Sequence, residues 1–349
     1  ADSVPEPVDA DTTRLNIKIE LHTLSFGGVD VRFDDDSLMH AQVRWEELEV
    51  AISELDLDRV RFGLGKMELK NAEVELRMPG AVDVSKGFNP GHIRLQRLGL
   101  QLSDIVYNSD TIAATLASMS FREQSGLVLN QLSMAVLLEP VRLQLSELYL
   151  RTPHSRLKNS TVLRFDSIGQ LSAGLAKVNI ETRISESFVG LRDVLLLAPT
   201  LSLGEGLQLP PVVRADVAFS GTVGRFKARL QVDSDLAGLK AEADMTSVDP
   251  DALAGKLLLN DLYFYSDSLN VELESVQVVA RSAPERKNLD VLLPFAEMHL
   301  QGDYKLTQLG AVVNNLMVKH FNVSNARYLP EGNQQFDLDV RLEDHPFLQ

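Results

Sequence analysis

The chain contains no cysteine among its 349 residues. This excludes disulfide bonds, thiolate zinc sites and a thiol nucleophile, and it suits an oxidising compartment. Aromatic residues make up only 6% of the chain, with a single tryptophan, whereas hydrophobic residues make up 44%. Compact enzymes line their pockets with more aromatic side chains than this. The composition therefore predicts a long, repetitive apolar surface.

The chain is also short of positive charge. It carries 34 Lys and Arg against 49 Asp and Glu, a formal net charge of -15. Such a surface repels phosphate backbones, and no basic cluster stands out along the sequence, so we expect no nucleic-acid partner. The same balance disfavours docking on anionic lipid headgroups. It does not disfavour binding of acyl chains, which depends on apolar area.

No apolar run approaches the roughly 18 residues that a membrane-spanning helix needs. The longest, residues 127–141, is interrupted by Asn130, Gln131 and Glu139. The sequence starts without methionine and without a signal peptide, so we expect a mature form or an internal fragment, with any targeting segment outside it.

Strict alternation of apolar and polar residues predicts β-strands. After an aperiodic acidic lead-in over residues 1–13, Leu15 to Leu21 alternate, as half-buried strands do. Gly27-Gly28 is predicted to end this strand, and Val29 to Phe33 to form the next. Asp34 to Asp36 stand where a turn is expected.

One pattern then recurs: apolar residues alternate, slip by one position, and alternate again. Leu143 and Leu145, followed by Leu148 and Leu150, are an example. A slip of one residue would move later side chains to the opposite face, unless a bulge absorbs the extra residue. A sheet bent at each strand curls into a trough. The same slip falls between Ile52 and Leu55, Leu69 and Ala72, Leu95 and Leu98, Leu129 and Leu132, and Leu259 and Leu262.

Helical signals are few. Ser187 is a candidate cap for a short helix over residues 188–197, and a helical period predicts a second helix over 307–321. No linker divides the chain, so we expect one continuous elongated segment over 14–349, with a soft boundary near 185–203. The predicted fold is all-β: a curved, repetitive sheet forming an open apolar groove.

The search for catalytic chemistry returns nothing above background. The seven histidines have no metal-binding spacing, and phosphate-binding loops and the G-x-S-x-G elbow are absent. We therefore expect a non-enzymatic protein with no catalytic residue, no metal and no cofactor.

Several segments resemble TamB-family translocation and assembly proteins of Bacteroidetes. They are Gly87 to Leu95, Ser120 to Leu127, Leu150 to Leu157, Phe188 to Asp193 with Ala198-Pro199, and Met298 to Tyr304. The resemblance spans most of residues 88–321 and implies a taco-like β-groove similar to that of AsmA-like proteins. It implies a periplasmic location, with the inner-membrane anchor and the region meeting a TamA-type outer-membrane barrel outside this chain.

Taken together, these features predict a periplasmic groove segment that moves phospholipid between the inner and outer membranes, with acyl chains as its partner. Two alternatives stay open: a scaffold for outer-membrane β-barrel assembly, and a purely structural β-solenoid whose interior is packed solid. The predicted lining residues are Leu95, Leu98, Leu100, Leu102, Leu129, Leu132, Met134, Leu143, Leu145, Leu148, Leu150, Leu259 and Leu262.

Overall fold

The computed structural model describes residues 22–56, 61–82, 84, 86–198, 209–249, 252–266, 270–283, 286–305 and 335–343. The side chains of Leu55, Asp56 and Ala283 are outside this description. The lead-in over 1–13, the strand predicted from Leu15 to Leu21 and the helix predicted over 307–321 also lie outside the described residues.

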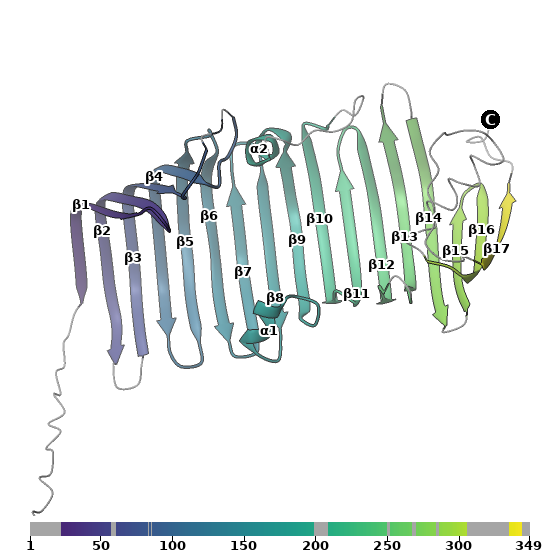
Figure 1. Ribbon diagram of the computed structural model, residues 1–349, viewed down its shortest axis with the longest axis horizontal. Helices are drawn as coiled ribbons and strands as arrows, with labels where there is room; N and C mark the ends of the chain where they lie inside the picture. Colours follow the sequence, from purple (N-terminus) through teal and green to yellow (C-terminus); the bar gives the residue numbers. More distant parts are fainter. Residues whose placement is uncertain are drawn as a thin grey trace, which may run out of the picture.

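The described residues form one sheet of 17 strands and two short helices (Figure 1). In order, the elements are β1 (Thr23–Asp35), β2 (Met39–Asp56), β3 (Arg61–Arg77), β4 (His92–Tyr107), β5 (Ile112–Glu123), β6 (Val128–Glu139), β7 (Arg142–Arg151), β8 (Arg156–Arg164), α1 (Ile168–Ala173), β9 (Asn179–Gly190), α2 (Leu191–Leu197), β10 (Val212–Thr222), β11 (Arg225–Asp233), β12 (Ala237–Ser247), β13 (Ala254–Tyr265), β14 (Asn270–Ala283), β15 (Arg286–Leu293), β16 (Ala296–Asp303) and β17 (Gln335–Leu342).

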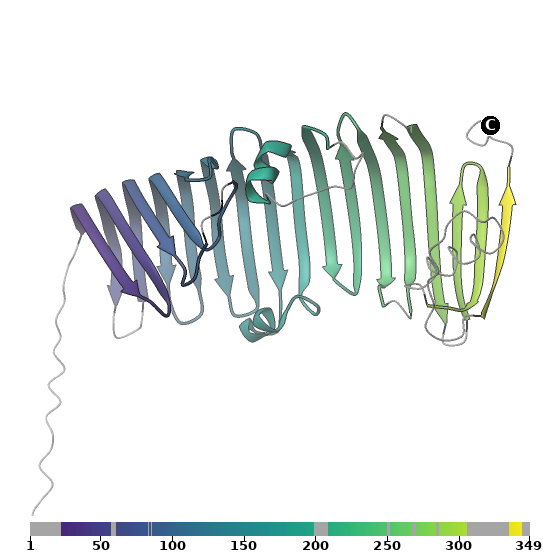
Figure 2. The ribbon, with the colours of Figure 1, turned by 45° about the horizontal axis from the view of Figure 1, so that its top comes forward.

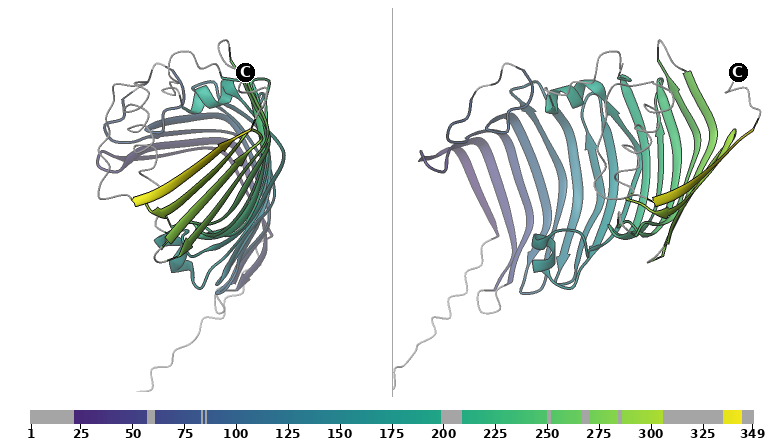
Figure 3. Two further views of the ribbon diagram at one scale, coloured as in Figure 1. Left: turned by 90° about the vertical axis from the view of Figure 1, so that its right-hand side faces the viewer. Right: turned by 45° about the vertical axis from the view of Figure 1, so that its right-hand side comes forward.

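Every strand pairs antiparallel with the next one in the sequence, so the sheet is an open meander with β1 and β17 at its edges. The predicted all-β fold is confirmed. Seen along the row of strands, the sheet is curved like a C (Figure 3). We call its two surfaces the concave and the convex face.

The predicted slips are bulges, and four of them contain a non-glycine residue in the left-handed conformation. Asn71, Arg97, Glu147 and Asp261 have φ angles of 49°, 53°, 54° and 52°. Each lies in the gap between two alternating apolar runs, where it takes up the extra residue. The slips after Ile52 and Leu129 appear as shifts in strand register. The bulge prediction is therefore confirmed.

Two local predictions are wrong. Gly27-Gly28 does not end a strand: β1 continues through it, and Gly28 at φ 64° is a bend within the strand. The helix predicted over 188–197 begins only at Leu191, because Phe188 and Val189 pair with β10 as the end of β9. Ser187 is consequently a buried strand residue, and Gly190 is the helix cap.

A single layer buries little. Among described elements, substantial contacts join neighbouring strands, with α2 against β9 as the exception. Fully buried apolar side chains are consequently few, and Val178, beside α1, is the largest with under 2% exposure.

Candidate functional site

We assign the predicted lining residues to the concave face from their burial and register. They lie on β4, β6, β7 and β13, and each is buried or half-buried. Leu98 and Leu129 are the most enclosed, at 8% and 7% exposure. Because side chains crowd together inside a curve and splay apart outside it, half-burial without a covering layer is what a concave surface produces. Register places Leu132 directly opposite Leu150, and the lining of a lipid groove by these residues stays a prediction.

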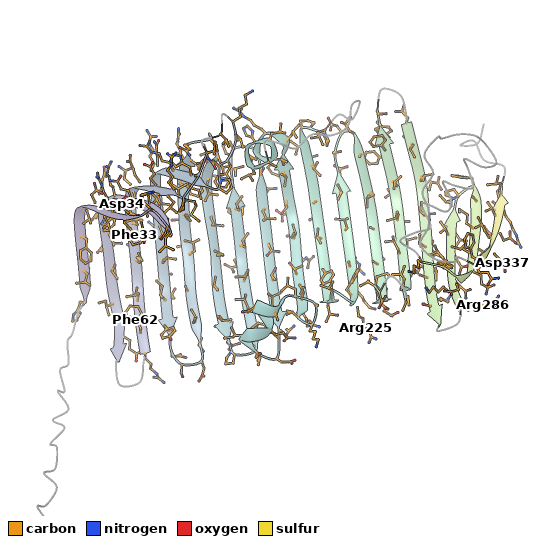
Figure 4. All side chains as sticks on the ribbon, in the orientation of Figure 1. Phe33, Asp34, Phe62, Arg225, Arg286 and Asp337 are labelled. Carbon is orange, nitrogen blue, oxygen red and sulfur yellow. The ribbon has the colours of Figure 1, made fainter. Side chains whose placement is uncertain are left out.

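Cross-strand register extends this face far beyond the predicted residues. From β6 to β17, one row of directly opposed residues runs Val136, Leu145, Thr161, Thr182, Phe219, Ala228, Ala243, Leu257, Val278, Val291, Met298, Val340. Neighbouring strands are about 4.8 Å apart, so this row spans about 50 Å. Figure 4 looks onto this face.

A second row follows the lower rim, the edge of the sheet at which α1 lies in Figure 1. Phe62, Tyr107 and Ile112 are exposed apolar members of it. It continues through Leu138, Leu143, Leu163 and Ile180. A hollow of about 520 Å³ opens beside Tyr107, Ile112 and Leu138, with Ile168 of α1 on its wall.

The convex face is charged. Lys227 pairs with Asp244 at 3.1 Å, and Arg229 approaches Glu242 at 3.6 Å. These side chains alternate along their strands with Ala228 and Ala243 of the concave row. Exposed pairs of this kind add little stability, but they keep this face in water. The two faces of the sheet therefore differ in chemistry along its length.

One polar cluster interrupts the concave face at its middle. Thr161 and Thr182 lie directly opposite each other on β8 and β9, with hydroxyl oxygens 2.7 Å apart. Asn159 donates to the Thr182 hydroxyl at 2.9 Å and accepts from Thr161 at 2.9 Å. The three side chains satisfy one another, so a polar group is present with little unmet hydrogen-bonding capacity. Strand periodicity did not reveal this cluster.

Four of the segments singled out in the sequence meet at the upper rim, the edge of the sheet at which α2 lies in Figure 1. In a meander every second connection lies at the same edge, which brings together the β3–β4, β5–β6, β7–β8 and β9–α2 connections. The Phe88 N–H donates to the Leu196 carbonyl at 2.6 Å, which joins the β3–β4 loop to α2. Gln124 bonds the carbonyl of His92 through its side chain at 2.6 Å.

The corner of β9 and α2 is the most tightly bonded part of this rim. Asp193, 5% exposed, accepts hydrogen bonds from Ser155 Oγ at 2.6 Å and from the Thr152 hydroxyl. The Arg156 guanidinium lies 5.2 Å from the centre of the Phe188 ring. A Cβ at Gly190 would lie 2.5 Å from the His154 carbonyl oxygen, so this close approach requires glycine. These contacts fix the corner, and we call them the Asp193 lock.

The N-terminal strands form the most strongly bent part of the trough, as Figure 2 shows. Trp45 lies there on β2, opposite Val29 and two positions after Val43. Its flanking neighbours Arg44 and Glu46 are exposed, whereas Trp45 is half-buried. Its indole Nε1 is enclosed and has no hydrogen-bond partner in the described structure. The only tryptophan of the chain therefore reports on the concave side.

Three of the described histidines, His40, His92 and His299, lie beside carboxylates. His92 contacts Glu75 at 3.1 Å and His299 contacts Asp290 at 3.0 Å. The His299 hydrogen bond, helped by the hydrogen bond and charge of Arg281, outweighs the opposing effect of burial and leaves the pKa of Asp290 below its usual range. Across the described part of the chain, no three His, Asp or Glu side chains gather as metal ligands. No described helix is long and apolar enough to span a membrane.

Comparisons with protein-family models, with curated proteins and with solved structures find no match for this chain.

Proposed function

We propose that this chain is a periplasmic lipid-conducting segment that carries phospholipid acyl chains along its concave face between the inner and outer membranes. The observation that supports this most is the apolar row running from β6 to β17 with no described element packed over it. Monomeric proteins rarely leave contiguous apolar patches larger than a few hundred Å² uncovered unless something binds there.

The energetics favour an acyl chain as the occupant. Each buried methylene contributes about 0.8 kcal/mol, so a sixteen-carbon chain gains roughly 13 kcal/mol over bare water. A continuous apolar trough removes most of that barrier without a chemical energy source. A long row of similar Leu, Val and Ala side chains binds a methylene chain equally well at each position, which permits sliding.

The polar cluster at Thr161 is compatible with this role. Its hydroxyl and amide groups are occupied by one another, so an acyl chain passing over them leaves few polar groups unpaired. The resemblance to TamB-family proteins supports the same reading and adds the periplasm as the expected compartment. It also adds a TamA-type barrel as a partner of regions outside this chain.

Native mass spectrometry of the purified chain, with lipid extraction, tests the proposal. We expect co-purifying phospholipid in the wild type and a loss of roughly tenfold or more in Leu145→Asp, because a charge on the concave face is costly beside acyl chains. Ser160→Asp is the matched control. Ser160 is exposed and directly precedes Thr161, the residue that opposes Leu145. Its side chain therefore lies on the convex face, where the variant adds the same charge. Equal lipid in both variants would refute the proposal.

The single tryptophan gives a second readout. A brominated lysophospholipid, added below the concentration at which it forms micelles, should quench Trp45 fluorescence, since bromine quenches on close approach. A brominated soluble alcohol at the same concentration should not. Unchanged Trp45 emission, in a chain that is β-rich by circular dichroism, would show that this part of the concave face does not take up acyl chains.

The sheet edges support a second candidate, a scaffold for outer-membrane β-barrel assembly. The outer edge of β1 has no described pairing partner, and Phe26, Val31 and Phe33 on it are exposed. Such an edge accepts an added strand. A photo-crosslinker at Asp30 that captures barrel precursors, in a chain without bound lipid, would favour this candidate.

The third reading, a structural β-solenoid with a solid interior, requires the concave face to be filled. No second described sheet lies against it, so this reading has the least support.

A further inference from the structure

We infer that the upper rim between β3 and α2 docks on a membrane surface rich in anionic phospholipid. This deepens the proposed function, because it names the surface through which the trough meets its lipid source. It rests on different residues from the concave face, so the two proposals are separable by experiment.

The rim is a connected surface. The Phe88–Leu196 hydrogen bond joins the β3–β4 loop to α2, and the Gln124 N–H donates to the Arg94 carbonyl at 3.0 Å. Asn89 holds the loop in shape, because its side chain donates to the Val82 carbonyl at 2.9 Å and accepts from the Gly91 N–H at 3.0 Å. A surface fixed in this way loses little conformational freedom on binding.

Apolar side chains protrude from this rim. Met78, Val82 and Val84 of the β3–β4 loop are exposed, with Val82 at 79%. Leu195 and Leu197 of α2 are also exposed. Figure 3 shows α2 at the upper mouth of the curve. Side chains placed there would enter the headgroup region of a bilayer while the concave face remains open beside it.

Exposed cations accompany these apolar side chains. Lys86, Arg122, Arg151 and Arg192 are exposed, and none makes an ion pair with a described carboxylate. The described carboxylates in the same four connections are Glu123 and Asp193, which are buried.

The positive character is confined to this stretch. The neighbouring β1–β2 turn on the same rim presents Asp34, Asp35 and Asp36. Net charge disfavours headgroup binding for the chain as a whole, but the meander collects cations that are far apart in the sequence. Cations beside protruding apolar side chains form the combination that binds anionic bilayers, and a basic residue near such a surface adds severalfold to affinity.

Vesicle co-flotation of the full chain tests this inference. We expect binding to vesicles of equal phosphatidylcholine and phosphatidylglycerol, weakened by salt, and at least tenfold weaker binding to phosphatidylcholine alone. The variant K86Q/R151Q/R192Q should lose roughly tenfold or more on the anionic vesicles. The double variant L195S/L197S should also bind more weakly but keep the salt dependence.

The matched control removes three exposed cations from the lower rim: R61Q/K177Q/R286Q changes net charge equally and should bind within twofold of wild type. Three outcomes would overturn the inference: no wild-type binding to anionic vesicles, equal loss in the two triple variants, or no loss in the upper-rim variant. Circular dichroism and unfolding midpoints establish that each variant folds. Quenching of Trp45 by monomeric brominated lysophospholipid should persist in the upper-rim variant, so a failure of docking is distinguishable from a failure of the lipid trough.

Discussion

Leu145 and Leu150 lie on the same face of β7 although an odd number of positions separates them. Glu147, at φ 54°, absorbs the extra residue between them. Leu145 opposes Val136 on β6, while Leu150 opposes Leu132 of the same strand, and register shifts on both sides of β7 accompany the change. This local irregularity keeps the apolar face continuous and bends the strand.

Substitution by glycine should stabilise the chain at Glu147, whereas it should destabilise the chain at an ordinary strand position. A left-handed conformation costs a non-glycine residue about 1–2 kcal/mol. Glu147→Gly should therefore raise the free energy of unfolding by about 0.5–1 kcal/mol, measured by urea denaturation, after the entropy loss of glycine is subtracted. Ser160→Gly, at an exposed regular strand position, should lower it by a similar amount. A destabilised Glu147→Gly would contradict the bulge assignment.

Deletion of Glu147 tests the consequence for the face. Without the extra residue, Leu145, Leu148 and Leu150 would alternate regularly and stay on the concave side, but β7 would lose its bend. We expect a loss of about 1–3 kcal/mol in unfolding free energy, because a straightened β7 no longer fits the register of β6 and β8. A deletion variant as stable as wild type would mean that β7 does not depend on the bulge.

The Asp193 lock should control the upper rim locally. Asp193→Ala leaves the Ser155 and Thr152 hydroxyls without their acceptor and should cost about 2–3 kcal/mol in local stability. Hydrogen exchange should accelerate in α2 and in the turn around His154, while β12 and β13 exchange as in wild type. Uniform acceleration across the sheet would show instead that the corner supports the whole fold.

Gly238 and Tyr263 form a directly opposed pair on β12 and β13. A Cβ at Gly238 would lie 2.5 Å from the tyrosine ring. Gly238→Ala should therefore cost about 1–3 kcal/mol through overpacking, measured by thermal or urea unfolding. Tyr263→Phe should cost about 1–2 kcal/mol, since its hydroxyl donates to Asp233 or to the Ser234 carbonyl. Full additivity in the double variant would contradict direct packing.

Asp290 should contribute to acid sensitivity. Its hydrogen bond from His299, together with Arg281 at 2.7 Å, holds its pKa below the ordinary value. A carboxylate with a lowered folded-state pKa stabilises the fold above about pH 4, and that contribution is lost as the pH falls through the folded-state pKa. Asp290→Asn should therefore flatten the decline in stability below pH 4. An unchanged decline in stability below pH 4 would show that the contacts of Asp290 contribute nothing measurable to the free energy of unfolding.

Local sequence features predicted the bulges and the all-β fold correctly, although not the continuation of β1 through Gly27-Gly28. Alternation around Leu143 and Leu148 reports directly which side chains share a face, and the slip between them has no solution in a continuous sheet other than a bulge. Helix boundaries were predicted less well. Residues 188–190 suit a helix in isolation, but the pairing of Val189 with Val213 keeps them in the sheet.

By itself, the sequence determined that this chain builds a long bent sheet with one apolar and one charged face, because period-two alternation and one-residue slips are local properties. Only the tertiary structure decided what gathers on that sheet. The pairing of Thr161 with Thr182 requires the register of β8 against β9. The contact of Phe88 with Leu196 requires the six strands from β4 to β9 to be laid side by side. The spacing of residues within a single segment predicts neither the register between strands nor the meeting of alternate turns at one rim, because both arise when the strands pair.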